Sequence, residues 1–413
     1  MKAVRPFKAI RPTEELAAKV AALPYDVMNS DEAREMVAEN PYSFLHVDKA
    51  EIDLDKSVGI YDAAVYAKAK ENLDKLVRDG VLAQDEKASY FIYKLTVDGR
   101  SQAGIVACPA VDDYLAGNIK KHELTRADKE EDRVRHVDTL DANTGPIYLA
   151  HKPSTALASI TSDWMAAHSP IYSFVADGNV EHTVWRVDDD AVISAISLAF
   201  EAVPALYIAD GHHRCASAVR VAQKRRSENP DYDGSEEFNY FLAVIFPSDQ
   251  LEIMDYNRLL SEKAGLNEAS LVGTLEENFY VKRADAAVKP AHSHEFGLCY
   301  KGSWYKLGAK PSIVNEDDPV EKLDVAILQR NVLTPIFGIE DPRTDKRIDF
   351  AGGIRGLEYL AERTKSDMAV AFSMYPTTID ELMDIADAGE IMPPKSTWFE
   401  PKLLSGLFIH KLS

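Results

Sequence analysis

Strand-like runs and helical stretches alternate along most of this 413-residue chain. Residues 90–96 and 102–109 have the composition of two strands, and the Asp98-Gly99 dipeptide between them is typical of a tight hairpin. A strand over 205–209 and a helix over 213–226 continue the alternation. Because such chains pack helices against sheets, the sequence predicts a mixed α/β (α+β) fold of mixed sheets with flanking helices.

The length of the chain allows two or three domains. We expect an N-terminal α/β region with a charged helix over 1–165, a central region over 166–265 and a C-terminal α/β region over 266–413. A content of 46% hydrophobic and 28% charged residues excludes disordered and collagen-like chains.

Charge and cysteine content narrow the function classes. The chain has 67 acidic and 47 basic residues, which gives a net charge of −20. This charge disfavours nucleic acid as a partner, although a local basic groove can still hold phosphate.

The three cysteines are widely separated and lack CxxC spacing, so the sequence supports neither a disulfide framework nor a cysteine-rich zinc site. No apolar leader or membrane-length run is seen, so we expect a cytoplasmic protein with no membrane partner. A homodimer is left open.

The most informative segment is Tyr207–Ala218, a buried strand that turns directly into a helix at Asp210-Gly211. A helix N-terminus offers free backbone N–H groups and a positive dipole end to an anion. Gly211 lets the backbone approach a phosphate, His213 and Arg214 add donors, and Asp210 could hold a metal ion or accept a proton. The alternative is an ordinary turn in which Asp210 caps the helix and the histidines lie on the surface.

Two further residues of this segment complete the hypothesis. We place His212 with Asp210 among the candidate catalytic residues, and Ser217 among the phosphate ligands. Zinc binding by the neighbouring His212 and His213 is disfavoured, because adjacent helical side chains point about 100° apart.

The charged stretch 120–136 is a second candidate. On one continuous helix, Arg126, Lys129 and Arg133 would share a side as clamps for a phosphate or carboxylate substrate, with Glu123 as a base on another side. The alternative is a solvated helix whose charges form salt bridges.

A proline-rich segment at 392–402 is a third candidate. Lys395, Ser396 and Thr397 could bind an anionic substrate on a loop that the prolines stiffen. The alternative is a packed connector with Trp398 and Phe399 in the core. The sequence contains no Walker A, GxGxxG, GxSxG or HExxH motif.

Five segments carry a resemblance to a known family. Residues 23–27, 40–45, 121–125, 210–214 and 393–397 resemble domain-of-unknown-function family 1015, also labelled SpoOJ/ParA/ParB/RepB-like, over nearly the whole chain. The Asp210–Arg214 segment also resembles the nucleotide-pocket motif of the ParB/sulfiredoxin superfamily, which includes free serine kinases. The His212-His213 pair departs from the arginine-rich version of the partition proteins.

The resemblance implies a central ParB/sulfiredoxin-like nucleotide-binding unit in which Gly211, His213 and Arg214 hold phosphate. It implies ATP or ADP with Mg²⁺ as cofactors, and a phosphotransferase or phosphatase acting on serine or phosphoserine. The alternatives are a nucleotide-binding switch without turnover and a ParB-like regulatory protein. A DNA-binding regulator is weaker, because the basic cluster at 220–226 is followed by acidic residues at 231–237.

Overall fold

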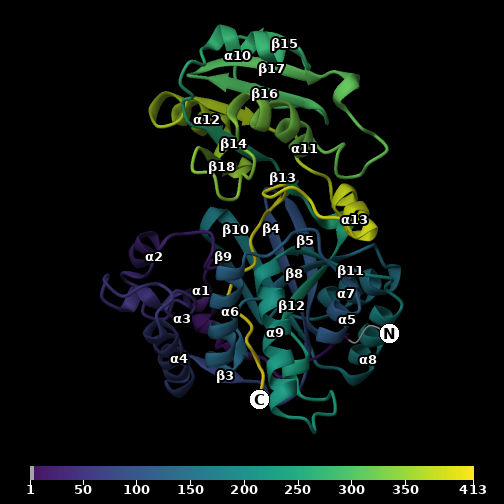
Figure 1. The fold of residues 1–413 in the computed structure, drawn as a ribbon. Coiled ribbons are helices and arrows are strands. Elements are labelled where there is room, and N and C mark those ends of the chain that lie inside the picture. Colours follow the sequence, from purple (N-terminus) through teal and green to yellow (C-terminus); the bar gives the residue numbers. More distant parts are fainter. Residues whose placement is uncertain (1–3) are drawn as a thin grey trace. The chain divides into compact units, whose positions relative to one another are not determined.

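The computed structural model describes residues 4–413, which divide into two compact units. The first unit contains the residues up to Leu251 together with Pro401–Ser413, and the second contains Glu252–Glu400 (Figure 1). Among the described residues, no helix is long and apolar enough to span a bilayer.

These units differ from the three regions predicted at 1–165, 166–265 and 266–413. One sheet crosses the predicted boundary near 165, since strand β10 (Val180–Val187) pairs with β4 (Tyr90–Val97) and β12 (Ala243–Pro247) pairs with β5 (Arg100–Pro109). The C-terminal segment then returns to the first unit. Strand pairing between distant segments, which local composition does not reveal, sets the real divisions.

The first unit is built on a mixed sheet, which has nine strands within residues 4–251. Its order is β6-β11-β8-β12-β5-β4-β10-β9, with β1 beside β5. The pairs β6–β11 and β8–β12 are parallel and the other pairs are antiparallel. The strands not yet bounded are β1 (Val4–Arg5), β6 (Ile119–Lys120), β8 (Ile147–His151), β9 (Tyr172–Ala176) and β11 (Leu206–Asp210).

The hairpin at Asp98-Gly99 is confirmed. Asp98 and Gly99 both have positive φ, 50° and 77°, and connect β4 to β5. Positive φ at both central residues is the geometry of the type I′ turn, which matches the twist of the two strands it joins.

Helices cover this sheet and form a second cluster beside it. Apolar side chains of α7 (Thr155–Ala167), α8 (Asp190–Glu201) and α9 (His212–Glu228) pack with the strands in one core. A separate core joins α2 (Ser30–Val37), α3 (Leu45–Asp48) and α4 (Ala63–Arg78). Helix α6 (Ala127–Leu140) packs along α9 (Figure 1). The remaining helices are α1 (Ala17–Val20) and α5 (Val111–Leu115). The fold class is therefore mixed α/β, as predicted.

Short pairings tie distant parts of the first unit together. Strand β2 (Ile10–Pro12) pairs with β3 (Leu82–Gln84), and β21 (His410–Lys411) pairs with β7 (Ala142–Asn143). The C-terminal segment forms the second of these pairings. The closing strand predicted over 407–410 is shorter in the structure, where it spans His410–Lys411.

The second unit contains an antiparallel sheet, with six strands in the order β15-β17-β16-β19-β14-β18 within residues 252–400. The strands are β14 (Tyr256–Leu260), β15 (Phe279–Ala284), β16 (Glu295–Tyr300), β17 (Ser303–Ala309), β18 (Ile348–Gly352) and β19 (Val370–Ser373). The helices are α10 (Glu268–Leu275), α11 (Asp324–Leu328), a π-helix (Gln329–Phe337), α12 (Gly356–Ser366) and α13 (Ile379–Ala388). Two short strands, β13 (Ile253–Met254) and β20 (Trp398–Phe399), pair with each other; one lies at the beginning of this unit and the other at its end.

Candidate functional site

Two predicted segments meet because their strands are parallel neighbours. Leu206 of β11 pairs with Ile119 of β6, and the next residues pair in the same direction. The carboxyl ends of parallel strands lie at one edge of a sheet, where sites in open α/β sheets form. His122 and Glu123, which follow β6, are therefore brought beside Asp210 and His212, which follow β11.

Gly211 fixes the geometry of this corner. Its φ is +93°, a left-handed conformation that L side chains rarely adopt. An added Cβ would lie 3.0 Å from Nε of Arg214, because the guanidinium folds back over the glycine. The Gly211 N–H donates to Oδ1 of Asp210 at 2.8 Å. This amide, predicted to face a phosphate, thus already has a protein partner, and the arginine guanidinium packs over the glycine.

Asp210 is surrounded by positive charge. Its Oδ2 lies 3.2 Å from Nζ of Lys402 and 3.9 Å from Nη2 of Arg214. Burial alone would raise the pKa of Asp210, but Lys402 and Arg214 outweigh burial and hold the pKa well below its usual range. An ionised carboxylate already balanced by two cations is a poor magnesium ligand, so this arrangement does not fit the metal role predicted for Asp210.

Arg214 has one donor that lacks a partner. Nη1 donates to the carbonyl oxygen of Pro146 at 2.6 Å, whereas Nε is buried and has no hydrogen-bond partner among the described residues. Buried polar groups in proteins are nearly always hydrogen-bonded. This donor therefore marks a place where a ligand could complete the structure.

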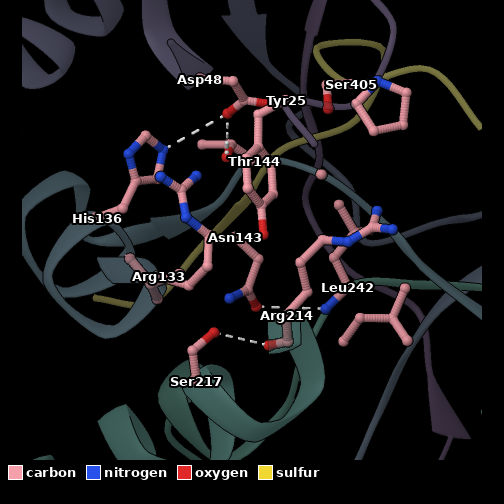
Figure 2. A pocket seen from close by; sticks show the side chains of 14 residues that line it. Tyr25, Asp48, Arg133, His136, Asn143, Thr144, Arg214, Ser217, Leu242 and Ser405 are labelled. Atoms are coloured by element: carbon pink, nitrogen blue, oxygen red, sulfur yellow. Dashed lines mark hydrogen bonds and ion pairs between the residues drawn. The ribbon is translucent and has the colours of Figure 1, made fainter. Parts of the chain in front are cut away.

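Arg214 lines a cavity of the first unit, which Figure 2 shows from close by. The cavity is small, with about 30 Å³ of room for the centre of a water-sized sphere; its empty volume of about 440 Å³ includes open solvent at the mouth. The lining comes from six separate stretches of chain: Pro24, Tyr25, Asp48, Arg133, His136, Val137, Asn143, Thr144, Gly145, Ile147, Arg214, Ser217, Leu242 and Ser405.

A second guanidinium belongs to the same cavity. Arg133 of α6 is buried, pairs with Asp132 at 2.7 Å and lies over the Tyr25 ring at 4.0 Å from its centroid. Figure 2 shows the Tyr25 ring between Arg133 and Arg214. Burial raises the pKa of Tyr25, so the ring stays neutral and its hydroxyl can donate. The lining thus combines two permanent cations with a neutral hydroxyl.

A buried carboxylate and imidazole form the opposite part of the lining. Oδ1 of Asp48 accepts a hydrogen bond from Oγ1 of Thr144 at 2.8 Å and lies 3.5 Å from Nε2 of His136. Burial would raise the pKa of Asp48, but contact with His136 reverses this and lowers it. Burial and the nearby Arg133 lower the pKa of His136. Asp48, Thr144 and His136 thus form a part of the cavity wall that is held together by their mutual contacts.

The other side of the corner holds two histidines. The rings of His122 and His212 meet edge to face, with centroids 4.5 Å apart. Nδ1 of His212 lies 3.9 Å from Oε2 of Glu123. Neighbouring His213 points elsewhere, since its Nε2 accepts the backbone N–H of Arg126 at 3.0 Å.

The structure separates the predicted basic stripe. Helix α6 begins at Ala127, so Glu123 and Arg126 precede it and the prediction of one continuous helical face was wrong. Arg126 is exposed and pairs with Asp128, and Lys129 donates to the Tyr61 hydroxyl at 2.8 Å. Only Arg133 of the three basic residues lines the cavity, because the helix turns it toward the interior.

The proline-rich candidate lies in the second unit up to Glu400, and its last two residues belong to the first unit. Lys395 lies over the Tyr256 ring at 5.7 Å, and Oγ of Ser396 donates to the Pro393 carbonyl at 2.5 Å. Thr397 follows in the same loop, and Phe399 is buried. These contacts fit the alternative of a packed connector, and the predicted substrate role of Lys395, Ser396 and Thr397 stays a prediction.

Sequence reasoning missed several lining residues. Tyr25 lies in a segment that carried the family resemblance, which was the available signal. Asp48, Asn143 and Ser405 stand in segments that carry no recognisable pattern of their own and meet only through the fold. His136 ends the charged stretch 120–136, in which only the basic residues and Glu123 were considered as site residues. Of the predicted ligands, Arg133, Arg214 and Ser217 do line one cavity.

The family follows from the chain itself. Residues 4–326 match the family model described as protein of unknown function (DUF1015), and the chain belongs to this family. No curated protein matches it in sequence.

Solved structures show only distant likeness. A free serine kinase in complex with AMP is 16% identical, with a TM-score of 0.36, over 71% of this chain and 86% of that one. A mutant free serine kinase in complex with ADP is 16% identical, with a TM-score of 0.35, over 76% and 88%. C-terminally truncated SbnI from Staphylococcus aureus is 11% identical, with a TM-score of 0.36, over 72% and 85%.

Proposed function

We propose that the first unit binds a nucleotide or another small phosphorylated ligand in the cavity between Arg133 and Arg214, and that the protein is a phosphotransferase or phosphatase. Serine or phosphoserine is the substrate to try first, which rests on the resemblance of the Asp210–Arg214 segment to free serine kinases. ATP and ADP are the nucleotides that the same resemblance implies.

The observation that carries the proposal is the buried Nε of Arg214, which lacks a partner among the described residues. A guanidinium offers a fork of N–H donors that matches the oxygens of a phosphate. Arg133 lines the same cavity. Two guanidinium groups can share the charge of one phosphoryl group, and stabilising that charge is most of the work in phosphoryl transfer.

The residues then take the following roles. Arg214 and Arg133 hold the phosphoryl oxygens, and Asp210 with Gly211 keeps the Arg214 guanidinium in place. In the kinase direction, the substrate hydroxyl oxygen attacks the terminal phosphorus, a new O–P bond forms, and the bond to the nucleotide bridging oxygen breaks. Glu123, whose side chain is 37% exposed, is the candidate acceptor for the hydroxyl proton.

A second function has its own support. The carboxylates nearest the arginines are all engaged: Asp48 with Thr144 and His136, and Asp210 with Lys402. A cavity whose carboxylates are committed to structure can bind an anion without turning it over. This favours a nucleotide-binding switch as the second candidate.

The DNA-binding alternative loses its support. The basic residues of α9 are each paired with acids: Arg220 with Glu130 and Glu131, Lys224 with Asp138, Arg225 with Asp141 and Arg226 with Asp112. A helix whose cations are already neutralised has little to offer a phosphate backbone.

The test compares two arginines of the same helix. Arg214→Ala should raise the Kd for ADP about 10- to 100-fold, because a hydrogen bond to a charged group contributes about 1.5–3 kcal/mol. Arg220→Ala, which removes an exposed arginine outside the cavity, should leave the Kd unchanged. Isothermal titration calorimetry measures both.

Turnover separates the two candidates. The protein is incubated in the presence of Mg²⁺ with ATP or ADP and serine, or with phosphoserine without nucleotide, and products are followed by phosphorus NMR. Phosphoserine or free phosphate that forms with wild type and not with Arg214→Ala supports the enzyme. Tight ADP binding without any product supports the switch, and an ADP affinity equal in wild type and Arg214→Ala contradicts both.

A further inference from the structure

We propose that His122, His212 and Glu123 form a binding site for a divalent first-row transition-metal ion of the zinc class. The three residues each offer one ligand atom, and these atoms lie within 4.8 Å of one another. The site lies at the carboxyl ends of β6 and β11, on the histidine side of the corner at Gly211. It is separate from the cavity, whose lining contains none of the three residues.

The first support is the state of His122. Its exposed fraction is 2%, and neither ring nitrogen has a well-formed hydrogen bond among the described residues. Structural histidines in protein cores are normally held by a hydrogen bond. A neutral imidazole has one lone pair, so a metal ion would account for one of these nitrogens. The other nitrogen would carry the hydrogen and face the backbone of Ile208.

The second support is the arrangement of the partners. His212 is 6% exposed and presents Nδ1 toward Glu123 at 3.9 Å, with its ring edge to face against His122. Around a tetrahedral ion with bonds of about 2.0–2.1 Å, donor atoms lie about 3.3 Å apart. The ligand atoms, which lie within 4.8 Å of one another, must therefore close by up to about 1.5 Å, to which the partly exposed Glu123 side chain can contribute.

The donor set selects the metal. Imidazole nitrogen suits zinc, iron, nickel and copper, whereas magnesium prefers carboxylate, carbonyl and water oxygens. Two histidines and one carboxylate are also the ligands of known catalytic zinc sites, in which the fourth position stays open to solvent or substrate.

The surroundings balance the charge of the ion. The Asp210 carboxylate is close enough to act electrostatically on both histidines, and Glu123 supplies a second negative charge. Lys402 already neutralises Asp210 on its other side. Asp210 is thus a charge outside the proposed ligand set, and the metal role predicted for this residue stays a prediction.

The experiment titrates chelator-treated protein with Zn²⁺ by competition calorimetry, and records the visible absorption spectrum with Co²⁺. We expect one Zn²⁺ per chain, a Co²⁺ spectrum typical of nitrogen ligation, and no displacement by Mg²⁺. His122→Gln, His212→Gln and Glu123→Ala should each weaken Zn²⁺ binding about 100-fold or more, since even outer-shell changes cost 10- to 100-fold.

Two histidines serve as controls. His213→Gln changes the residue next to His212, and His182→Gln changes a buried histidine that bonds to the Tyr93 hydroxyl. Both should keep the wild-type Zn²⁺ affinity. Glu123→Ala keeps the test decisive if a buried histidine variant does not fold, because this side chain is 37% exposed.

Three outcomes overturn the proposal: no stoichiometric Zn²⁺, Zn²⁺ binding that survives Glu123→Ala, or equal loss in His213→Gln. Zn²⁺ binding can be measured without nucleotide, but the two proposals share Glu123, which would be a ligand when the ion is bound and the proton acceptor only without it. The Kd for ADP in the Arg214→Ala variant tests that function separately, so failure of one proposal is distinguishable from failure of the other.

Discussion

At the residue scale, Gly211 links the backbone to the candidate site. Its left-handed conformation turns β11 into α9, and the missing side chain leaves the space that the Arg214 guanidinium occupies. The sequence predicted that the missing side chain would admit a phosphate. In the structure it admits the guanidinium of an arginine whose side chain also lines the cavity.

Substitution of this glycine should therefore affect binding as well as stability. Gly211→Ala adds left-handed strain of about 1–2 kcal/mol and pushes the guanidinium away. Gly117→Ala is the matched control, because its φ is +75° and nothing lies within 4 Å of an added Cβ. Urea unfolding should show a larger loss for Gly211→Ala, and calorimetry should show weaker ADP binding for this variant alone. Wild-type ADP affinity in Gly211→Ala would contradict the role of this contact.

At the element scale, the pairing of α6 with α9 determines which predicted residues meet. The two helices are joined along their length by ion pairs, from Arg220 with Glu130 to Arg225 with Asp141. This pairing brings Arg133 of α6 and Arg214 of α9 to one cavity. Helical spacing placed Lys129 and Arg133 on one helix but wrongly included Arg126, and it could not show that Arg133 faces inward.

The half-buried ion pair should matter more than the exposed one. Arg225 has a side chain that is 16% exposed and contacts both Asp138 and Asp141, whereas Arg220 is 43% exposed. Arg225→Ala should lower the free energy of unfolding by about 1.5–3 kcal/mol, and Arg220→Ala by less than about 1 kcal/mol. Urea unfolding followed by circular dichroism measures both. Equal losses would show that burial does not distinguish the pairs.

At the scale of the whole molecule, the first unit is discontinuous in sequence. Its C-terminal segment pairs β21 with β7, supplies Lys402 to Asp210 and places Ser405 in the cavity lining. The segment also buries Leu403, Leu404, Leu407, Phe408, Ile409 and Leu412. Each buried side chain of this kind contributes about 1.5–3 kcal/mol, and together they rival the total stability of a domain.

Truncation tests this dependence. A chain ending at Glu400 should lose the folded first unit, whereas residues 252–400, a continuous stretch with its own sheet, should remain folded. Limited proteolysis with mass spectrometry should then find cleavage within 4–251 and protection within 252–400. Removal of Ser413 alone is the control and should change neither. Protection of 4–251 in the chain ending at Glu400 would refute the prediction.

The sequence by itself determined the local elements, because hairpin turns, helix periodicity and strand runs depend on neighbours a few residues apart. It therefore gave the Asp98-Gly99 hairpin, the strand–turn–helix at Asp210-Gly211 and the mixed α/β class. Tertiary structure alone decided that Tyr25, Asp48 and Ser405 line one cavity, and that His122 faces His212. The parallel pairing of β6 with β11 joins segments almost ninety residues apart. Local propensity depends on neighbouring residues, so it cannot predict which distant strands will form hydrogen bonds with each other.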